Sequence, residues 1–345
     1  MMAELWFWLL AGMLAVYAVL DGFDFGVGML HFVLAKNQAE RDTLLRSIGP
    51  VWDGNEVWLV AAGGTLFGAF PALYAAAFSG FYLPLMLVLW LLLFRALGIE
   101  LRHQLESALW HQFWDVAFSA ASALLALFFG AALGNLVRGL PLQENGEFFE
   151  PLWTNFKVGD VTGILDWYTL LVGVTATASL GLHGALWLGL KTDGALARRA
   201  DDLARQSWPF VAVLALATTL ASGVVQPRLL DNLQRFPFGA ALPLLAGAGL
   251  IGIRLFVGRA PGRAFLASCA FIVFLILSAA FAIFPNALTA RVAGRELTVV
   301  AAAASPDTLA GMLWWWLPGL ALAVSYSYFI YARMPKKFTP EGGEH

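Results

Sequence analysis

The chain has 345 residues, of which 60% are hydrophobic and only 13% are charged, with a formal net charge of −2. Soluble domains carry about 25% charged residues, so this composition excludes an ordinary water-soluble protein. The sequence has no run of basic residues that would bind nucleic acid. Its single cysteine, Cys269, excludes an internal disulfide framework and a multi-cysteine metal site.

Apolar stretches long enough to cross a bilayer recur along the chain. A membrane-spanning helix needs about 20 mostly apolar residues. We predict nine such spans, at about 5–34, 52–70, 74–94, 113–137, 163–190, 208–226, 239–257, 265–284 and 311–332. The short uncharged turn after the second span predicts an antiparallel hairpin with the third. The expected fold class is therefore all-α integral membrane, with nine transmembrane helices.

The basic residues divide unevenly between the two sides of these spans. Fifteen of the 21 lysines and arginines, Arg95 among them, fall in the odd-to-even connections or the C-terminal tail. Because lysine and arginine accumulate in cytoplasmic loops, we predict that the N terminus is outside and the C terminus inside. The outer segment 138–162 is acidic and is expected to be solvated; its acids are Glu144, Glu147, Glu150 and Asp160.

Five acidic residues lie inside the spans or at their starts. Two share one face of the first span, two open the second span at the same spacing, and one lies near the start of the fourth: Asp21, Asp24, Asp53, Glu56 and Asp115. Ionisable groups at membrane depth are costly and mark functional sites by default. The predicted orientation places all five in the cytoplasmic half, with no lysine or arginine in those turns to neutralise them. Carboxyl groups grouped away from water can exchange protons near neutral pH, so the pattern predicts a proton route.

Structural roles compete with this interpretation. Asp53 and Asp115 could cap their helices, because the positive N-terminal end of a helix favours an anion. Asp21 and Asp24 could be polar contacts between helices. Trp58 follows Asp53 by one or two turns and is expected to pack over the acids.

A haem site within the chain is a separate question. A haem held by two histidines needs imidazoles deep in facing helices, and only His183 lies well inside a predicted span. A hydrogen-bonded core histidine is the more frequent interpretation of one interior His. The alternative is a free-standing b-type cytochrome that uses His183 as a ligand.

Three blocks in the first three spans are distinctive: LDGFDFGVG at 20–28, SIGPVWDGNEVWL at 47–59 and AAAFSGFY at 75–82. Looser matches follow, among them His183-Gly184-Ala185 and Phe284-Pro285. With these blocks the sequence resembles subunit II of the cytochrome bd-type quinol oxidases, including their cyanide-insensitive branch. The resemblance covers essentially the whole chain.

The resemblance implies two four-helix bundles plus one peripheral helix, which divides the chain into 1–140, 141–285 and 286–345. It implies a terminal oxidase of the bacterial inner membrane whose partner, subunit I, carries b- and d-type haems, oxidises quinol and reduces O2 to water. This chain would hold no haem and no catalytic residue, and it would support assembly of subunit I. A small accessory subunit, membrane lipid and a structural quinone are the further candidate partners.

The resemblance also assigns roles to residues. It implies that Asp53 belongs to a cytoplasmic proton path, close to Trp58, and we expect Glu56, Asp21 and Asp24 to support it. The competing function is a proton-coupled secondary transporter, since acids at membrane depth are common to both classes. Broken helices with inverted repeats would favour the transporter, and neither is clear in the sequence.

Overall fold

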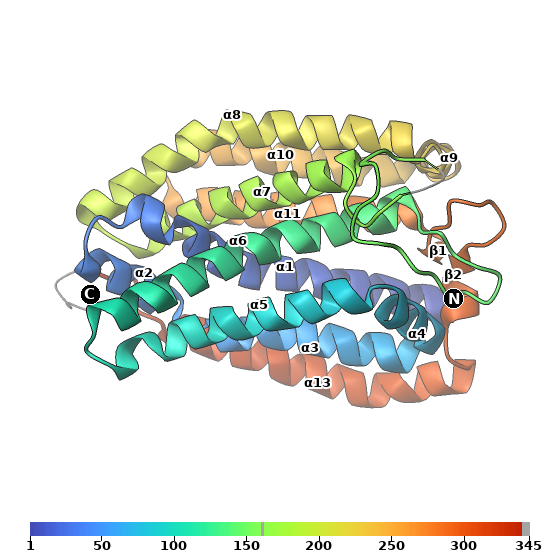
Figure 1. Ribbon diagram of the computed structural model, residues 1–345, viewed down its shortest axis with the longest axis horizontal. Coiled ribbons are helices and arrows are strands. Elements are labelled where there is room, and N and C mark those ends of the chain that lie inside the picture. The colour runs from blue at the N-terminus through green and yellow to red at the C-terminus, as the bar shows by residue number, and fades with distance from the viewer. Residues whose placement is uncertain (160–161, 340–345) are drawn as a thin grey trace.

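The computed structural model describes residues 1–159 and 162–339, most of them in helices aligned along one long axis (Figure 1). In this part of the chain eight helices are long and apolar enough to cross a membrane, or nine if one bent pair counts as a span. The all-α membrane fold class is therefore confirmed. The elements are α1 (Met2–Leu34), α2 (Gln38–Ile48), α3 (Trp52–Ala69), α4 (Pro71–Gly80), α5 (Tyr82–Glu100), η1 (Arg102–Gln104), α6 (Ala108–Arg138), α7 (Trp167–Lys191), α8 (Gly194–Val225), α9 (Arg228–Arg235), η2 (Pro237–Ala240), α10 (Ala241–Phe256), α11 (Pro261–Ile283), β1 (Asn286–Leu288), β2 (Leu297–Thr298), α12 (Val299–Ala302) and α13 (Pro306–Arg333).

The first helix, α1, is the centre of the packing. It contacts α3, α6, α7 and α11, and its segment 21–28 is buried at every position. The backbones of α1 and α7 come very close, because a Cβ added at Gly26 would lie 2.6 Å from the Cα of Gly184. Side chains of the segment 21–28 therefore point into protein on all sides, whereas Phe32 and Val33 at the end of α1 are exposed.

The other long helices pack in pairs around α1. α5 lies against α6, α8 against α7, α10 against α11, and α13 against α3. Both α1 and α6 also pack on α7, so the first and second halves of the described chain share one hydrophobic core. The exposed surface of α13 fits a peripheral helix. The division into bundles at 140 and 285 stays a prediction.

The predicted boundaries of the second and third spans differ from the structure. The run predicted as one span at 74–94 is divided between α4, which ends at Gly80, and α5, which begins at Tyr82. The chain also bends by 119° between α3 and α4. α4 lies near the N terminus, and α5 runs antiparallel to α3 as far as Glu100 (Figure 1). Hydropathy missed the break because 71–94 is one uninterrupted apolar stretch. Because α5 continues to Glu100, Arg95 lies inside this helix and not in the loop where it was expected.

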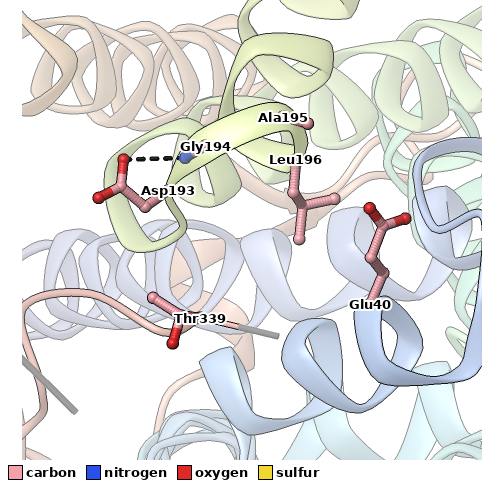
Figure 2. Close-up of a pocket in the computed structure, with 6 residues that line it drawn as sticks. All are labelled: Glu40, Asp193, Gly194, Ala195, Leu196 and Thr339. Carbon is pink, nitrogen blue, oxygen red and sulfur yellow. Dashed lines mark hydrogen bonds between the residues drawn. The ribbon is translucent and has the colours of Figure 1, made fainter. Parts of the chain in front are cut away.

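The two ends of the molecule are built differently. One end, here called the α2 end, holds α2, the turn between α7 and α8, and the segment after α13. That segment is tied down: the backbone N–H of Phe338 donates to the carbonyl of Lys191, and Arg46 donates to the carbonyl of Thr339. A hollow between α2 and the start of α8 opens beside it (Figure 2), lined by Glu40, Asp193, Gly194, Ala195, Leu196 and Thr339. The predicted orientation, which would make this end cytoplasmic, stays a prediction.

The opposite end, the loop end, holds the N terminus, the connection between α6 and α7, and the antiparallel pair β1–β2. Glu144 and Glu147 of this connection are exposed, as predicted. Asp160 lies outside the described residues. For Glu150 the solvated-loop prediction is wrong, because its side chain is wholly buried.

Glu150 belongs to a set of charged residues that we call the loop-end clasp: Arg138, Glu150, Asp166 and Arg291. The Oε1 atom of Glu150 lies 2.8 Å from Nη2 of Arg138 and 2.6 Å from Nη2 of Arg291. Arg138 also pairs with Asp166, which caps α7. The clasp joins four parts of the chain: the end of α6, the loop between α6 and α7, the start of α7 and the loop after α11. It was missed because its basic members lie far apart in the sequence.

Candidate functional site

Acidic side chains from two helices meet in the half of the molecule nearer the α2 end. Asp21 and Asp24 lie one turn apart on α1 and are wholly buried. Glu56 lies in the second turn of α3, which packs on α1, and its side chain is 24% exposed. These three acids and Arg95 are called the acid cluster below. The predicted convergence of Asp21, Asp24 and Glu56 is thus present in the structure.

Arg95 of α5 bridges two of these acids. Its Nη1 atom lies 2.5 Å from Oδ1 of Asp21, and its Nη2 atom lies 2.7 Å from Oε1 of Glu56. The guanidinium is wholly buried and also lies over the ring of Phe25, 4.8 Å from its centroid. The prediction that no cation accompanies the acids is therefore wrong, because α5 continues past the predicted end of its span and carries Arg95 into the interior.

Asp24 has a different environment. Its Oδ2 atom accepts a hydrogen bond of 2.8 Å from the side-chain amide of Asn55. Its Oδ1 atom has no hydrogen-bond partner within the part of the chain that the structure describes. The amide oxygen of Asn55 in turn accepts from the hydroxyl of Tyr331 on α13, at 2.8 Å. Arg95 therefore bonds Asp21 and Glu56 directly, whereas Asp24 is held by a neutral amide.

Asp53 is the predicted site residue that the structure does not bring into this group. It is exposed on α3, and its side chain does not cap the helix. Its charge acts on Glu56, three residues further along α3. Asp53 thus stands at the protein surface beside the acid cluster and is not one of its buried members.

Trp58 lies one turn beyond Asn55 and is buried in the hydrophobic core. Its indole N–H has no hydrogen-bond partner among the described residues. It occupies the same side of α3 as Asn55, as three-residue spacing on a helix requires. The predicted packing of Trp58 over the acids stays a prediction.

Asp115 belongs to a separate ion-pair group nearer the α2 end. Its Oδ1 atom lies 2.7 Å from Nε2 of His31 and 2.6 Å from Nε of Arg102, and Arg41 lies 3.5 Å from its Oδ2 atom. His31 follows Asp24 on α1 by seven residues, which corresponds to roughly 10 Å along the helix. The prediction of an unneutralised acid is wrong here as well. The cations come from α2 and η1, segments that were expected to be loops.

The comparison with known proteins decides the family. The model described as cytochrome bd terminal oxidase subunit II matches residues 2–334. The chain belongs to this family. The resemblance inferred from the three sequence blocks is confirmed, and subunit II implies a subunit I partner in a multi-pass protein of the inner membrane.

Curated relatives and a solved structure agree with this assignment. Cytochrome bd-I ubiquinol oxidase subunit 2 of Escherichia coli (strain K12) is 33% identical over 364 residues, covering 97% of this chain and 94% of the relative. Cytochrome bd ubiquinol oxidase subunit 2 of Bacillus subtilis (strain 168) is 36% identical over 220 residues, covering 63% and 62%. The structure of bd oxidase from Geobacillus thermodenitrificans matches with a TM-score of 0.73 at 18% identity, covering 96% of this chain and 97% of that chain. At this identity the likeness shows the shared fold.

His183, the interior histidine of this subunit II, is hydrogen-bonded at both ring nitrogens. Nδ1 lies 2.7 Å from the hydroxyl of Ser268, and Nε2 lies 3.0 Å from the carbonyl oxygen of Val19. The ring stacks on Phe265 with the two centroids 4.8 Å apart. A haem iron needs a free imidazole nitrogen, so His183 does not fit an axial ligand. Across residues 1–159 and 162–339 no group of three or more His, Cys, Asp or Glu could hold a metal ion.

Three residues of the site were missed by the sequence interpretation: Arg95, Asn55 and Tyr331. Arg95 had a signal, because the residues after it, Ala96 to Ile99, remain mostly apolar and continue the helix. Asn55 lies in the distinctive second block but carries no charge. Tyr331 had no signal at all, since only the packing of α13 on α3 brings it near.

Proposed function

We propose that this subunit II is the haem-free partner in a complex that oxidises quinol and reduces O2 to water. The b- and d-type haems would belong to subunit I, whose assembly this chain supports, and this chain would not be catalytic alone. Similarity to a ubiquinol oxidase subunit along nearly the full length of both chains supports this. Reduction of O2 to water consumes protons, so the complex needs a proton route, and this chain contributes part of it.

The acid cluster is the observation that carries the proposal. Two of its three carboxyl groups pair with one guanidinium and the third, Asp24, does not. Exposure falls from Asp53 at the surface through Glu56 to the buried Asp21 and Asp24. Buried charges are normally paired, because removing an ion from water is costly. A buried group with more acids than cations can instead accommodate an additional proton. The graded exposure offers that proton a way between the surface and the interior.

The position of Asp53 indicates where the route leaves the chain. Its neighbours on the exposed side of α3 are apolar: Val57 is 43% exposed and Val60 is 75% exposed. A carboxyl group on such a face would be costly against lipid. We infer that subunit I covers this side of α3 and that Asp53 exchanges protons with it.

The test is Asp53→Asn in the assembled complex, measured by quinol-dependent O2 consumption, with haem content read from the absorption spectrum. A side chain that transfers a proton in the slow step typically raises the rate by a factor of about 100 or more. We expect Asp53→Asn to lower turnover by a factor of about 10 or more, with the haems retained. Asp202→Asn is the matched control, because Asp202 is also an exposed aspartate, with its side chain 61% exposed. Normal turnover of the Asp53→Asn complex at full haem content would remove Asp53 from the route.

The orientation is part of the proposal. With the α2 end in the cytoplasm, protons would be taken up from inside, and the loop end would face outward. The distribution of lysine and arginine supports this arrangement. A cysteine placed at Gly146 in a Cys269→Ala background should react with a membrane-impermeant reagent added outside intact cells, and one placed at Lys336 should not.

Broken helices with inverted repeats would favour the transporter alternative, with the break at the acids. The 119° break between α3 and α4 lies at the loop end, away from the acid cluster (Figure 1). It follows that the break does not bring unwound backbone to the carboxyl groups.

A further inference from the structure

The peripheral helix α13 reaches the acid cluster through one side chain. Most of α13 is exposed: Tyr328, for example, is 76% exposed. Tyr331, near the end of this helix, is only partly exposed, and its ring packs edge-on against Trp187 of α7 with the centroids 6.3 Å apart. Its hydroxyl donates to the amide oxygen of Asn55 at 2.8 Å. Tyr331 thus turns inward from a helix that otherwise mostly faces outward.

Asn55 is almost fully buried, and the structure uses both ends of its amide. The amide nitrogen donates to Oδ2 of Asp24 at 2.8 Å and to the carbonyl oxygen of Leu20 at 3.0 Å. A primary amide has two N–H donors and one oxygen acceptor. Both donors are therefore directed at α1, and the oxygen is left for the hydroxyl of Tyr331.

This arrangement sets which end of the amide faces the acid. If the amide were reversed, its oxygen would face the Leu20 carbonyl and the Asp24 carboxyl group, which are both acceptors when Asp24 is ionised. The hydroxyl of Tyr331 supplies the buried donor that satisfies the amide oxygen in the observed orientation. Without it, a buried acceptor would be left without a partner, and the observed orientation would lose one of its three bonds.

We propose that Tyr331 is a positioning residue of the acid cluster: it holds the Asn55 amide so that an N–H, and not an oxygen, faces Asp24. The peripheral helix α13 thereby takes part in the proton-exchanging site of subunit II. The consequence for turnover rests on the proposed proton route, whereas the consequence for the hydrogen bond to Asp24 does not. The ionisable groups that act most strongly on Asp24 are Asp21 of α1 and Arg95 of α5, and neither bonds to Asn55.

The experiment compares Tyr331→Phe with Tyr328→Phe in the complete complex. Tyr328→Phe is the matched control, since it removes the same hydroxyl from the same helix at an exposed position. The primary readout is the infrared carboxyl band of Asp24, identified by its loss in the Asp24→Asn complex. The second readout is the division of the quinol oxidase activity between kcat and KM.

We expect Tyr331→Phe to displace the Asp24 band and to lower kcat by roughly tenfold with KM for quinol unchanged. Tyr328→Phe should change neither quantity. In the Asp24→Asn background, Tyr331→Phe should cause no further loss of kcat. An unchanged Asp24 band in the Tyr331→Phe complex would overturn the proposal and leave Tyr331 as a packing contact.

The outcomes also separate this inference from the proton route. A displaced Asp24 band with normal turnover in both Tyr331→Phe and Asp24→Asn would support the positioning role and overturn the proton route through Asp24. If Tyr331→Phe fails to assemble, fluorotyrosine at position 331 keeps the hydroxyl and changes its donor strength. The Asp24 band should then shift in the assembled complex, and its failure to shift would overturn the proposal.

Discussion

The acid cluster and the loop-end clasp are both mostly buried groups of ionisable side chains, yet they differ in their balance of acids and cations. The clasp holds two arginines, Arg138 and Arg291, against two acids, Glu150 and Asp166, and these pairs are direct. The acid cluster holds three acids and one cation: Arg95 pairs with Asp21 and Glu56, and Asp24 has no cation bonded to it. A balanced group is suited to holding loops together. An excess of acid is suited to accommodating an additional proton.

The largest expected effect is the loss of the central cation of the clasp. Arg138→Met would leave Glu150 and Asp166 in the interior without their shared partner. Breaking a buried ion pair in this way costs about 3–5 kcal/mol. We expect a markedly lower thermal transition of the purified complex and poor recovery of subunit I with it. Arg295→Met is the control, since Arg295 is 40% exposed at the same end. Equal stability of the two variants would show that the clasp is not a stabilising element.

A smaller effect should distinguish the two groups directly, through the same substitution in each. Glu150→Gln removes an acid whose Oε1 atom accepts from Arg138, Arg291 and Thr162, and we expect a loss of about 1–3 kcal/mol. Glu56→Gln leaves Arg95 with Asp21 and makes the acid cluster less unbalanced, so stability should change by less than about 1 kcal/mol.

Thermal unfolding of the two complexes, followed with the same probe, measures the difference. A larger loss for Glu56→Gln than for Glu150→Gln would contradict the distinction between a structural and a proton-exchanging group. The turnover of Glu56→Gln then reports its share in the proton route.

The smallest effect concerns the ion pair of Glu40 and Arg199 at the rim of the α2 end. It tests whether an ion pair near the surface, outside both groups, makes the local stability of α2 depend on pH. Burial raises the pKa of Glu40, but hydrogen bonds from Arg199 and from the backbone N–H of Lys36 hold this pKa below its ordinary value overall. Because the pKa of Glu40 is lower in the folded than in the unfolded protein, the pairing stabilises α2 at pH values above the unfolded-state pKa. This stabilisation is lost as the pH falls through the folded-state pKa. The protection of α2 against hydrogen exchange, taken relative to the intrinsic exchange rate at each pH, should therefore fall in acid in the native complex and be less pH-dependent in Glu40→Gln. The same pH dependence in both would show that Glu40 does not anchor α2.

Much of the fold followed from hydropathy. The spans near α1, α6, α7, α10, α11 and α13 were placed within several residues, because each is a long apolar run bounded by proline, glycine or charge. For α8 only the end was placed well: the helix begins at Gly194, well before the predicted start at 208, because its first turns are polar. The prediction was wrong where an apolar run contained a turn, at Phe81, since a bend between two apolar helices leaves no trace in hydropathy.

The sequence predicted which acids meet at the site, but the prediction that no cation accompanies them was wrong. Asp21, Asp24 and Glu56 were found because a carboxyl group inside an apolar stretch is unusual wherever it occurs. Arg95 was assigned to a loop by a span boundary placed too early, and Asp53 proved to be exposed where a place in the buried cluster was expected. The proton route through these residues stays a proposal.

The sequence by itself determined that the chain is a membrane protein, that it belongs to the subunit II family, and that α1 and α3 carry acidic residues. These conclusions depend on composition and local spacing, which one chain displays directly. Only the tertiary structure decided that Arg95 pairs with Asp21 and Glu56, and that Tyr331 reaches Asn55. Those contacts join residues of α1, α3, α5 and α13 across long separations in the chain, and helix packing alone brings them within hydrogen-bond distance.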